Sequence, residues 1–386
     1  MRSLRDIPQL ANVPVLVRAA LNAPVESGRV ANDYRLRRAV PTIRFLAEKG
    51  ARVILVSHIG EKGTETLAPV AEALGRLLPR VYFSEATVGA SAREAVRRLA
   101  AGDILVLENL RRNPGETTND PVFAKELAAL ADVFVQDSFD TCHRLHASIV
   151  GVPALLPSYA GLLLEEEVAA LSGALTPPAP SLAVIGGAKS STKEAVIEAL
   201  LPSYTHVFVG GALANDFLAA RGEEVGKSLT SAADRESVAR MLASLKLVLP
   251  VDSLVIPAAA AGTLTARAEA RVRGAGEVQP DEMILDHGPA TIALLTDLAR
   301  TAKGVLWNGP LGKYEDGFTV ATDALARAIA SSRANSVVGG GDTVASIENL
   351  GLLPRFSFVS TGGGAMLEFL ARGSLPGISA LETSAS

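Results

Sequence analysis

The stretch Val337-Val-Gly-Gly-Gly-Asp-Thr343 places three glycines between an apolar run and the predicted start of a helix, and Val359-Ser-Thr-Gly-Gly-Gly-Ala365 repeats this pattern. A strand that ends in glycines and leads into a helix leaves backbone N–H groups free to bind a phosphate. Glycine also lets the backbone come close to such an anion. One such loop is weak evidence, but two in series, with further Gly-rich loops upstream, favour a nucleotide or phosphoryl-group site.

Composition limits the class of protein. The chain has 386 residues, of which 48% are hydrophobic, so we expect two domains with large buried cores. A formal net charge of −4 and a pI near 5.9 argue against nucleic acid as the main partner. The single cysteine, Cys142, is expected to be a buried filler rather than a nucleophile. With no apolar run near the roughly 20 residues of a membrane helix, we expect a cytoplasmic protein with no membrane partner.

Short apolar runs alternate with helical patterns along the whole chain, which predicts parallel sheets covered by helices on both faces. In the first half, strands are expected at 13–17, 53–57, 104–107 and 133–136, with helices at 36–49, 67–78, 92–99 and 122–130. In the second half, strands are expected at 182–185, 207–209, 247–249, 304–306, 336–338 and 358–359, with helices at 193–201, 212–221, 235–245, 291–301, 321–330 and 343–350.

The predicted fold class is α/β, with two doubly wound, Rossmann-like parallel-sheet domains that face a cleft and are joined by a hinge helix. The Pro-rich stretch Thr176-Pro-Pro-Ala-Pro180 follows that helix, predicted at 162–175. The resulting division is 1–160 for a first domain, 161–178 for the connection, 179–365 for a second domain and 366–386 for a C-terminal segment that returns toward the first domain. The tail after Gly373 is expected to be surface chain.

The second half carries several loops suited to phosphates. Gly186-Gly187 ends a predicted strand, and Lys189 and Lys193 are spaced so that both can reach one anion near a helix N-terminus. Lysines in a first helical turn oppose the helix dipole, so they favour function over stability. Asp342, directly after a glycine run, suits a Mg2+ ion bridged to phosphate oxygens, or an N-cap, or both. For Trp307, a role as a buried core residue and a role in contact with the ligand are equally plausible expectations.

The first half offers a basic counterpart. Arginine and histidine side chains are predicted at or just after strand ends or in loops, which in parallel sheets is where ligands bind; they are Arg18, Arg35, His58, Arg111, His143 and Arg144. Arginines gathered there could clamp a small anion that carries carboxylate and phosphate groups. Neither a Walker pattern nor a protein-kinase signature occurs at these loops, so the phosphate chemistry belongs to another architecture.

An ordered series of motifs resembles the phosphoglycerate kinase family over nearly the whole chain. The motifs are Leu16-Val-Arg-Ala-Ala-Leu-Asn-Ala-Pro24, Ser57-His-Ile-Gly60, Leu107-Glu-Asn-Leu-Arg111, Asp137-Ser-Phe-Asp-Thr-Cys-His-Arg-Leu-His146, Gly186-Gly-Ala-Lys189, Leu249-Pro-Val-Asp252, Trp307-Asn-Gly-Pro310, Gly339-Gly-Gly-Asp-Thr343 and Ser360-Thr-Gly-Gly-Gly364. The resemblance implies reversible phosphoryl transfer between ATP and the carboxylate of 3-phosphoglycerate, giving 1,3-bisphosphoglycerate and ADP in glycolysis or gluconeogenesis. It also implies Mg2+, a monomer and hinge closure during turnover.

The resemblance also implies roles for individual residues. The acid would be held by Arg18, Asn22, Arg35, His58, Arg111 and Arg144. Catalytic roles would fall to Arg35 and Lys193 and to N–H groups near Gly341 and Gly363. The nucleotide would be bound by Gly187, Lys189, Lys193, Gly210, Gly211, Gly288, Asn308, Pro310, Glu315, Gly340, Gly341, Asp342 and Thr343, with Asp342 also on the metal. Positioning and charge stabilisation suffice for phosphoryl transfer, so these residue types fit the reaction.

Three departures from the family pattern fall on the acid-binding side. Ala20 stands where the family has an Asp, Glu61 where it has an Arg, and Asp140 adds a carboxylate beside the same pocket. On the nucleotide side, Ala212 replaces a third glycine. An acid in place of an arginine next to a dianionic phosphate replaces attraction with repulsion, so we expect tight nucleotide binding and weakened 3-phosphoglycerate binding.

Three other functions compete with this one. The chain could be a kinase for a different small carboxylate, or a nucleotide-binding paralogue without turnover. Retention of Arg35, Lys193 and Asp342 favours an enzyme. The hypothesis of a dinucleotide dehydrogenase has less support, since no Gly-x-Gly-x-x-Gly motif follows the first strand.

Overall fold

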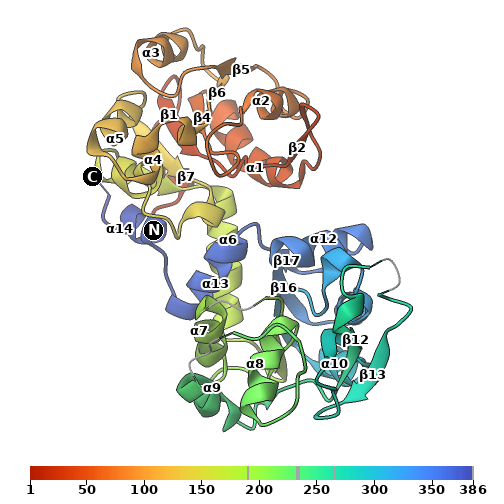
Figure 1. Cartoon of the computed structure of the whole chain (residues 1–386). Helices are drawn as coiled ribbons and strands as arrows, with labels where there is room; N and C mark the ends of the chain where they lie inside the picture. The colour runs from red at the N-terminus through yellow and green to blue at the C-terminus, as the bar shows by residue number, and fades with distance from the viewer. Residues whose placement is uncertain (189–190, 232–234, 264–265, 385–386) are drawn as a thin grey trace. The chain divides into compact units, whose positions relative to one another are not determined.

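The computed structural model describes residues 1–188, 191–231, 235–263 and 266–384. The chain divides into two compact units, one formed by Met1–Ala169 with Ser374–Ser386 and the other by Ala170–Gly373. Their helices and strands are labelled in Figure 1. Within the described ranges, no helix has the length and apolar character needed to cross a membrane.

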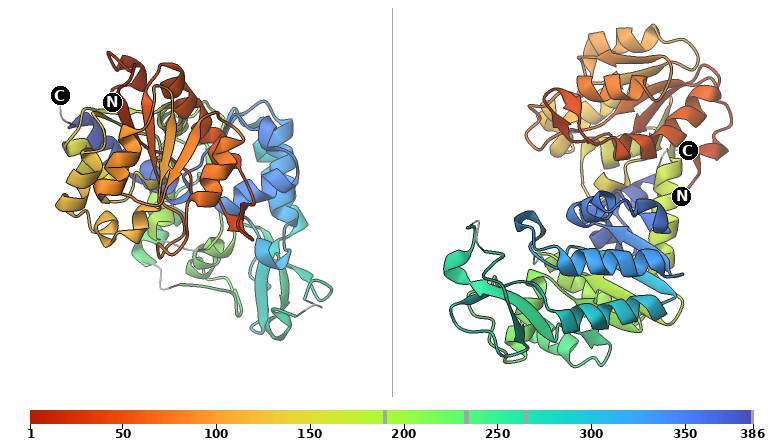
Figure 2. Two further views of the ribbon diagram at one scale, coloured as in Figure 1. Left: turned by 90° about the horizontal axis from the view of Figure 1, so that it is seen from above. Right: turned by 90° about the vertical axis from the view of Figure 1, so that its right-hand side faces the viewer.

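The first unit is built on a six-stranded parallel sheet in the order β5-β6-β4-β1-β7-β8. The strands are β1 (Pro14–Arg18), β4 (Arg52–Val56), β5 (Val81–Ser84), β6 (Ile104–Leu107), β7 (Val133–Gln136) and β8 (Ser158–Ala160). The main helices are α1 (Tyr34–Glu48), α2 (Ala68–Gly75), α3 (Gly89–Arg97) and α5 (Pro121–Ala128). Every residue of β1 is buried, because helices cover both faces of this sheet (Figure 2).

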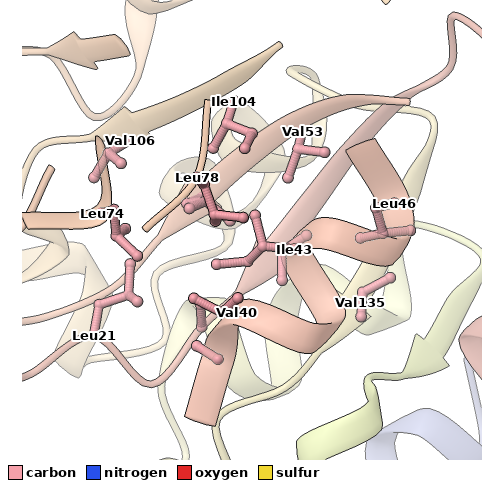
Figure 3. Packing of buried hydrophobic residues seen from close by; sticks show 14 of the residues in the cluster. Leu21, Val40, Ile43, Leu46, Val53, Leu74, Leu78, Ile104, Val106 and Val135 are labelled. Atoms are coloured by element: carbon pink, nitrogen blue, oxygen red, sulfur yellow. The ribbon is translucent and has the colours of Figure 1, made fainter. Parts of the chain in front are cut away.

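The core of this unit lies between α1 and the sheet. Ile43 of α1 is fully buried and packs among Val53, Ile104 and Val135 from three strands (Figure 3). Close packing of this kind fixes α1 on the sheet and thereby places Arg35, in its first turn.

The second unit repeats the plan with the strand order β11-β10-β9-β15-β16-β17, again all parallel. The strands are β9 (Ser181–Ile185), β10 (His206–Val209), β11 (Leu247–Val248), β15 (Gly304–Asn308), β16 (Asn335–Gly339) and β17 (Phe358–Val359). The helices are α7 (Ser191–Leu200), α8 (Ala212–Ala220), α9 (Arg235–Leu242), α10 (Pro289–Thr301), α11 (Val320–Ser331), α12 (Gly341–Asn349) and α13 (Gly363–Arg372).

Both sheets have a point at which the chain changes its direction of winding. In the first unit β1 lies between β4 and β7, and in the second β9 lies between β10 and β15. Ligands of open α/β sheets bind beyond the carboxyl ends of the strands at such switch points. The fold therefore marks the ends of β1 and β7, and of β9 and β15, as binding edges.

The predicted fold class is confirmed as two parallel-sheet α/β units, and the helix expected at 162–175 is present as α6 (Leu162–Leu175). The sequence analysis missed an antiparallel sheet of β12 (Asp252–Pro257), β13 (Arg271–Gly274) and β14 (Glu282–His287). It also missed the strands β5 and β8. These strands are short, partly exposed or polar, so they lack a continuous apolar run.

The tail was expected to be surface chain, and this is wrong. Residues Pro376–Glu382 form helix α14, whose Ile378 and Leu381 are buried. The Gly377 N–H donates to the Cys142 carbonyl, which ties the tail to the first unit.

Candidate functional site

Arg18, the last residue of β1, is the centre of the basic site in the first unit. Its guanidinium is 1% exposed, and it donates to Ser148 Oγ at 3.1 Å and to the Ala19 carbonyl at 3.0 Å. One nitrogen lies 3.0 Å from His58 Nδ1. Arg18 thus braces the loops after β1 and β4 from inside, while its charge contributes to the field at the sheet edge.

His58 is neutral in this environment. Burial lowers its pKa to about 3, and the charge of Arg18 acts in the same direction. Its Nδ1 can therefore accept the hydrogen bond from Arg18.

Arg35 reaches the same edge from the first turn of α1. Its Nη1 donates to Asn22 Oδ1 at 3.1 Å and to Asp140 Oδ2 at 3.0 Å. Arg35 and Asn22 are partly exposed, whereas the Asp140 side chain is only 6% exposed. The structure therefore brings the sequence-predicted Asn22 and Arg35 together, and Asp140 bonds to the same nitrogen of Arg35.

Arg111 follows β6, and the loop after β4 folds over it. Its Nη1 donates to the Gly60 carbonyl at 2.6 Å. Gly63 has a φ of +73°, and a side chain there would collide with the Arg111 backbone carbonyl. This contact sets Glu61, which is exposed and whose charge acts on Arg111, beside the arginine.

Arg144 is exposed and its charge acts on Arg111, so these two arginines also lie within electrostatic reach of each other. Sequence reasoning missed the polar residues that support the arginines. Glu116 is fully buried and accepts from Ser148 Oγ at 2.6 Å, and Ser148 in turn accepts from Arg18. No spacing rule links residues 18, 116 and 148, so no signal in the chain could have found this network.

In the second unit, the turns after β9 and β15 interlock at the switch point. The Gly186 N–H donates to the Asn308 carbonyl at 2.8 Å, and the Gly187 N–H donates to the Pro310 carbonyl at 2.6 Å. A side chain at Gly309, which has a φ of +95°, would collide with the Gly186 carbonyl. Pro310 and Asn308 thus lie directly against the Gly186-Gly187 turn.

The turn after β10 joins the same edge. A side chain at Gly211 would collide with the Gly187 N–H, and one at Gly210 would come within 2.9 Å of His287 Nε2. His287 Nε2 in turn accepts from the Gly211 N–H at 3.3 Å. Gly288, the N-cap of α10, directly follows His287, the residue whose ring contacts the Gly210-Gly211 turn.

The two triple-glycine runs begin helices α12 and α13. Thr343 Oγ1, buried in the first turn of α12, accepts from the Gly309 N–H at 3.0 Å. A Cβ built at Gly363 would lie 3.6 Å from the Gly340 Cα and 4.0 Å from the Gly341 N. The two helix N-termini therefore lie side by side, and their first N–H groups and dipoles suit an anion.

Lys193 lies against this edge from α7. Its Nζ donates to the carbonyls of Gly186 and Ala188, both at 2.7 Å. Burial lowers the pKa of Lys193 to about 8, and the charge of Asp342 opposes that shift. Lys189, its predicted partner, lies outside the described residues.

Two further residues occupy different positions. Glu315 is exposed in the short 3-10 helix Tyr314–Asp316. The hydroxyl of its neighbour Tyr314 accepts a hydrogen bond from Asn349 Nδ2 at the C-terminal end of α12, away from the glycine turns described above. Trp307 is fully buried and its Nε1 donates to the Gly309 carbonyl, so it is a core anchor that also supports the turn.

The oxygen ligands available for Mg2+ in the second unit are few. Asp342 is exposed at the start of α12, and the described residues hold no group of three or more His, Cys, Asp or Glu side chains that could bind a metal by themselves. Mg2+ with nucleotides uses one or two carboxylates and takes its other oxygens from phosphates and water. A single carboxylate beside two helix N-termini therefore fits the ion.

Comparison with known proteins finds one family over nearly the whole chain. The family model described as "Phosphoglycerate kinase" matches residues 4–372. The chain belongs to the phosphoglycerate kinase family. It is 45% identical to the phosphoglycerate kinase of Pelotomaculum thermopropionicum, with 98% of each chain covered, and 44% identical to that of Xanthobacter flavus, again with 98% of each covered.

Solved structures of phosphoglycerate kinases share its fold. That of Coxiella burnetii has a TM-score of 0.84 at 39% identity, with 98% of each chain covered. That of Pyrococcus horikoshii has a TM-score of 0.88 at 31% identity, with 99% of each chain covered. These full-length relationships do not favour the alternatives of a different acid substrate or a paralogue without turnover.

The departures from the family pattern take different positions in the structure. Ala20 is buried at 1% exposure, Glu61 is exposed, and Asp140 is paired with Arg35. Only Asp140 is therefore both buried and bonded to a residue that the phosphoglycerate kinase pattern assigns to the acid.

Proposed function

We propose that this chain catalyses the phosphoglycerate kinase reaction. A carboxylate oxygen of 3-phosphoglycerate attacks the γ-phosphorus of ATP, and the bond from that phosphorus to the β,γ-bridging oxygen breaks. The products are 1,3-bisphosphoglycerate and ADP, and the reaction is reversible. Similarity to phosphoglycerate kinases over 98% of the chain carries this proposal.

In the first unit, Arg18, Arg111 and Arg144 supply the field that attracts the anionic acid, and Arg35 with Asn22 and neutral His58 orients it. The support is the contact of Arg18 with His58 and of Arg35 with Asn22 near the switch point of the sheet, and the electrostatic action of Arg144 on Arg111. Arg35 also stabilises charge on the transferring phosphoryl group.

In the second unit, the turns of Gly187, Gly210, Gly211 and Gly288 with Asn308, Pro310 and Glu315 bind the adenosine part of the nucleotide. Gly340, Gly341 and Thr343 bind its phosphates, and N–H groups near Gly341 and Gly363 stabilise the transition state. Lys193, with Lys189, neutralises phosphate charge. Asp342 holds Mg2+, which when bound offsets negative charge on the phosphate oxygens. We further propose a monomeric cytoplasmic enzyme.

The test is turnover of the purified chain with ATP, Mg2+ and 3-phosphoglycerate, coupled to NADH oxidation through consumption of 1,3-bisphosphoglycerate. We expect oxidation that requires both substrates. Lys193→Met should lower kcat by about 100-fold because one charge that follows the phosphoryl group is lost. Lys227→Met, on an exposed residue of the same unit, is the matched control. ADP binding without turnover would reject the proposal in favour of a paralogue without activity.

A further inference from the structure

Asp140 is a buried acid inside a basic site. Its side chain is 6% exposed. Oδ1 accepts from Ser138 Oγ at 2.5 Å, and Oδ2 accepts from Arg35 Nη1 at 3.0 Å. Both carboxylate oxygens therefore have a fixed partner, which predicts a well-defined orientation.

The carboxylate is charged despite its burial. Burial acts to raise the pKa of Asp140, but the positive charges around it, that of Arg35 first, and the hydrogen bond from Ser138 together lower the pKa below its ordinary value. A buried acid with this pairing is costly to leave unpaired, so it ties the guanidinium firmly.

Arg35 is held through one nitrogen only. Nη1 donates to both Asp140 and Asn22, and within the described ranges Nε and Nη2 make no hydrogen bond. The side chain remains 29% exposed. The guanidinium is thus anchored at one corner, while its other donors stay available to an anion.

The surrounding charges explain why an anchor is needed. Arg18 and Arg111 act electrostatically on the same region as Arg35, since all three influence the pKa of His58. Like charges repel, so without a fixed anion Arg35 would turn toward solvent before substrate arrives. Asp140 offsets this repulsion in the empty site.

We propose that Asp140 is a positioning residue for phosphoryl transfer that holds the Arg35 guanidinium in its working orientation. This inference rests on the proposed function. It differs from a purely electrostatic view, in which Asp140 only weakens binding of the anionic acid.

The experiment compares Asp140→Asn and Asp140→Ala with wild type in the coupled assay. We expect kcat to fall by about 10- to 100-fold, more for Ala than for Asn, because misplacement of one reacting-group contact costs up to about two orders of magnitude. The KM for ATP and the affinity for ADP should stay within about twofold, because the nucleotide residues belong to the other unit.

Asp33→Asn is the matched control. Asp33, the N-cap of the helix that carries Arg35, pairs with Arg37 at 2.8 Å, but the pair is exposed. This variant should keep wild-type kcat. If the Asp140 variants do not fold, Ser138→Ala leaves the carboxylate in place and removes one of its two anchors, and kcat should fall by about three- to tenfold.

A double-mutant cycle with Arg35→Lys tests whether Asp140 acts through Arg35. Non-additive losses in kcat support this, and additive losses overturn it. Unchanged kcat in Asp140→Asn, including a lower KM for 3-phosphoglycerate with kcat intact, would overturn positioning while wild-type turnover still upholds the proposed function. A wild-type chain without turnover would overturn both.

Discussion

At the scale of residues, we expect single charges to set the affinity of the proposed acid site. Glu61 is exposed, and its negative charge acts on Arg111, which the proposed function assigns to the anionic acid. Exposed pairs contribute little, whereas the paired Asp140 is shielded from water and salt. We therefore expect the two acids to have different consequences, with simple repulsion of the substrate from Glu61 alone.

We expect Glu61→Arg to lower the KM for 3-phosphoglycerate roughly fivefold, which corresponds to about 1 kcal/mol of binding free energy, with kcat little changed. Steady-state kinetics at low and high salt measure this, and the gain should shrink as salt screens the charge. Glu48→Arg, an exposed exchange in the last turn of α1, is the control and should have no effect. An unchanged KM in Glu61→Arg would show that Glu61 does not face the acid.

The second prediction concerns pH and Lys193. With its pKa lowered to about 8, this side chain loses its proton as the pH rises through about 8, and kcat/KM for ATP should fall in step. A bound phosphate favours the charged form of Lys193, so the fall of kcat at high pH should begin at a higher pH than the fall of kcat/KM. Lys193→Arg stays charged throughout and should remove the limb while it lowers kcat. A limb that persists in Lys193→Arg would belong to another group.

At the scale of elements, the sites are made by turns that follow parallel strands. The turns touch each other through backbone atoms, as Gly309 does with Gly186 and Gly63 does with Arg111. Such contacts leave no room for a Cβ, so the glycines fix the spacing of the loops that carry the functional side chains.

A pair of glycines in the first unit tests this. Gly63 and Gly28 both have positive φ, but only Gly63 faces backbone atoms, since nothing lies within 4 Å of a Cβ at Gly28. We expect Gly28→Ala to cost about 1 kcal/mol from its backbone conformation. Gly63→Ala should cost about 1–3 kcal/mol more and raise the KM for 3-phosphoglycerate, because Glu61 and Arg111 shift. Calorimetric unfolding and kinetics check both, and equal losses would contradict the packing argument.

At the scale of the whole molecule, each unit carries its own switch point and its own set of proposed binding residues. Ligands that bind only the folded protein raise its stability by mass action. The nucleotide and the acid should therefore each raise the unfolding temperature when added alone.

We expect ADP with Mg2+ to raise the unfolding temperature more than ADP with a chelator. Asp342→Asn should remove that difference but keep the effect of metal-free ADP, because the helix N-termini remain. Scanning calorimetry measures the shifts, with Asp297→Asn, an exposed acid of α10, as the control. A Mg2+ dependence that survives in Asp342→Asn would place the metal elsewhere.

Much of the fold could be predicted because strands such as β1, β9 and β15 are continuous apolar runs that end in turn residues. The antiparallel sheet of β12, β13 and β14 could not, because partly exposed strands such as Arg271–Gly274 carry no such pattern. Helix α14 was missed for a similar reason, since its burial depends on contacts with Cys142 and Ile149, which are remote in sequence.

The sequence by itself determined the family, the fold class and the residue types of both sites, because glycine turns and basic residues after apolar strands follow from local chemistry. Only the tertiary structure decided which of those residues meet. The pairing of Asp140 with Arg35, the support of Arg18 by Ser148 and Glu116, and the contact of His287 with Gly211 join residues far apart in the chain. Strand order and packing set these contacts, and no local pattern encodes them.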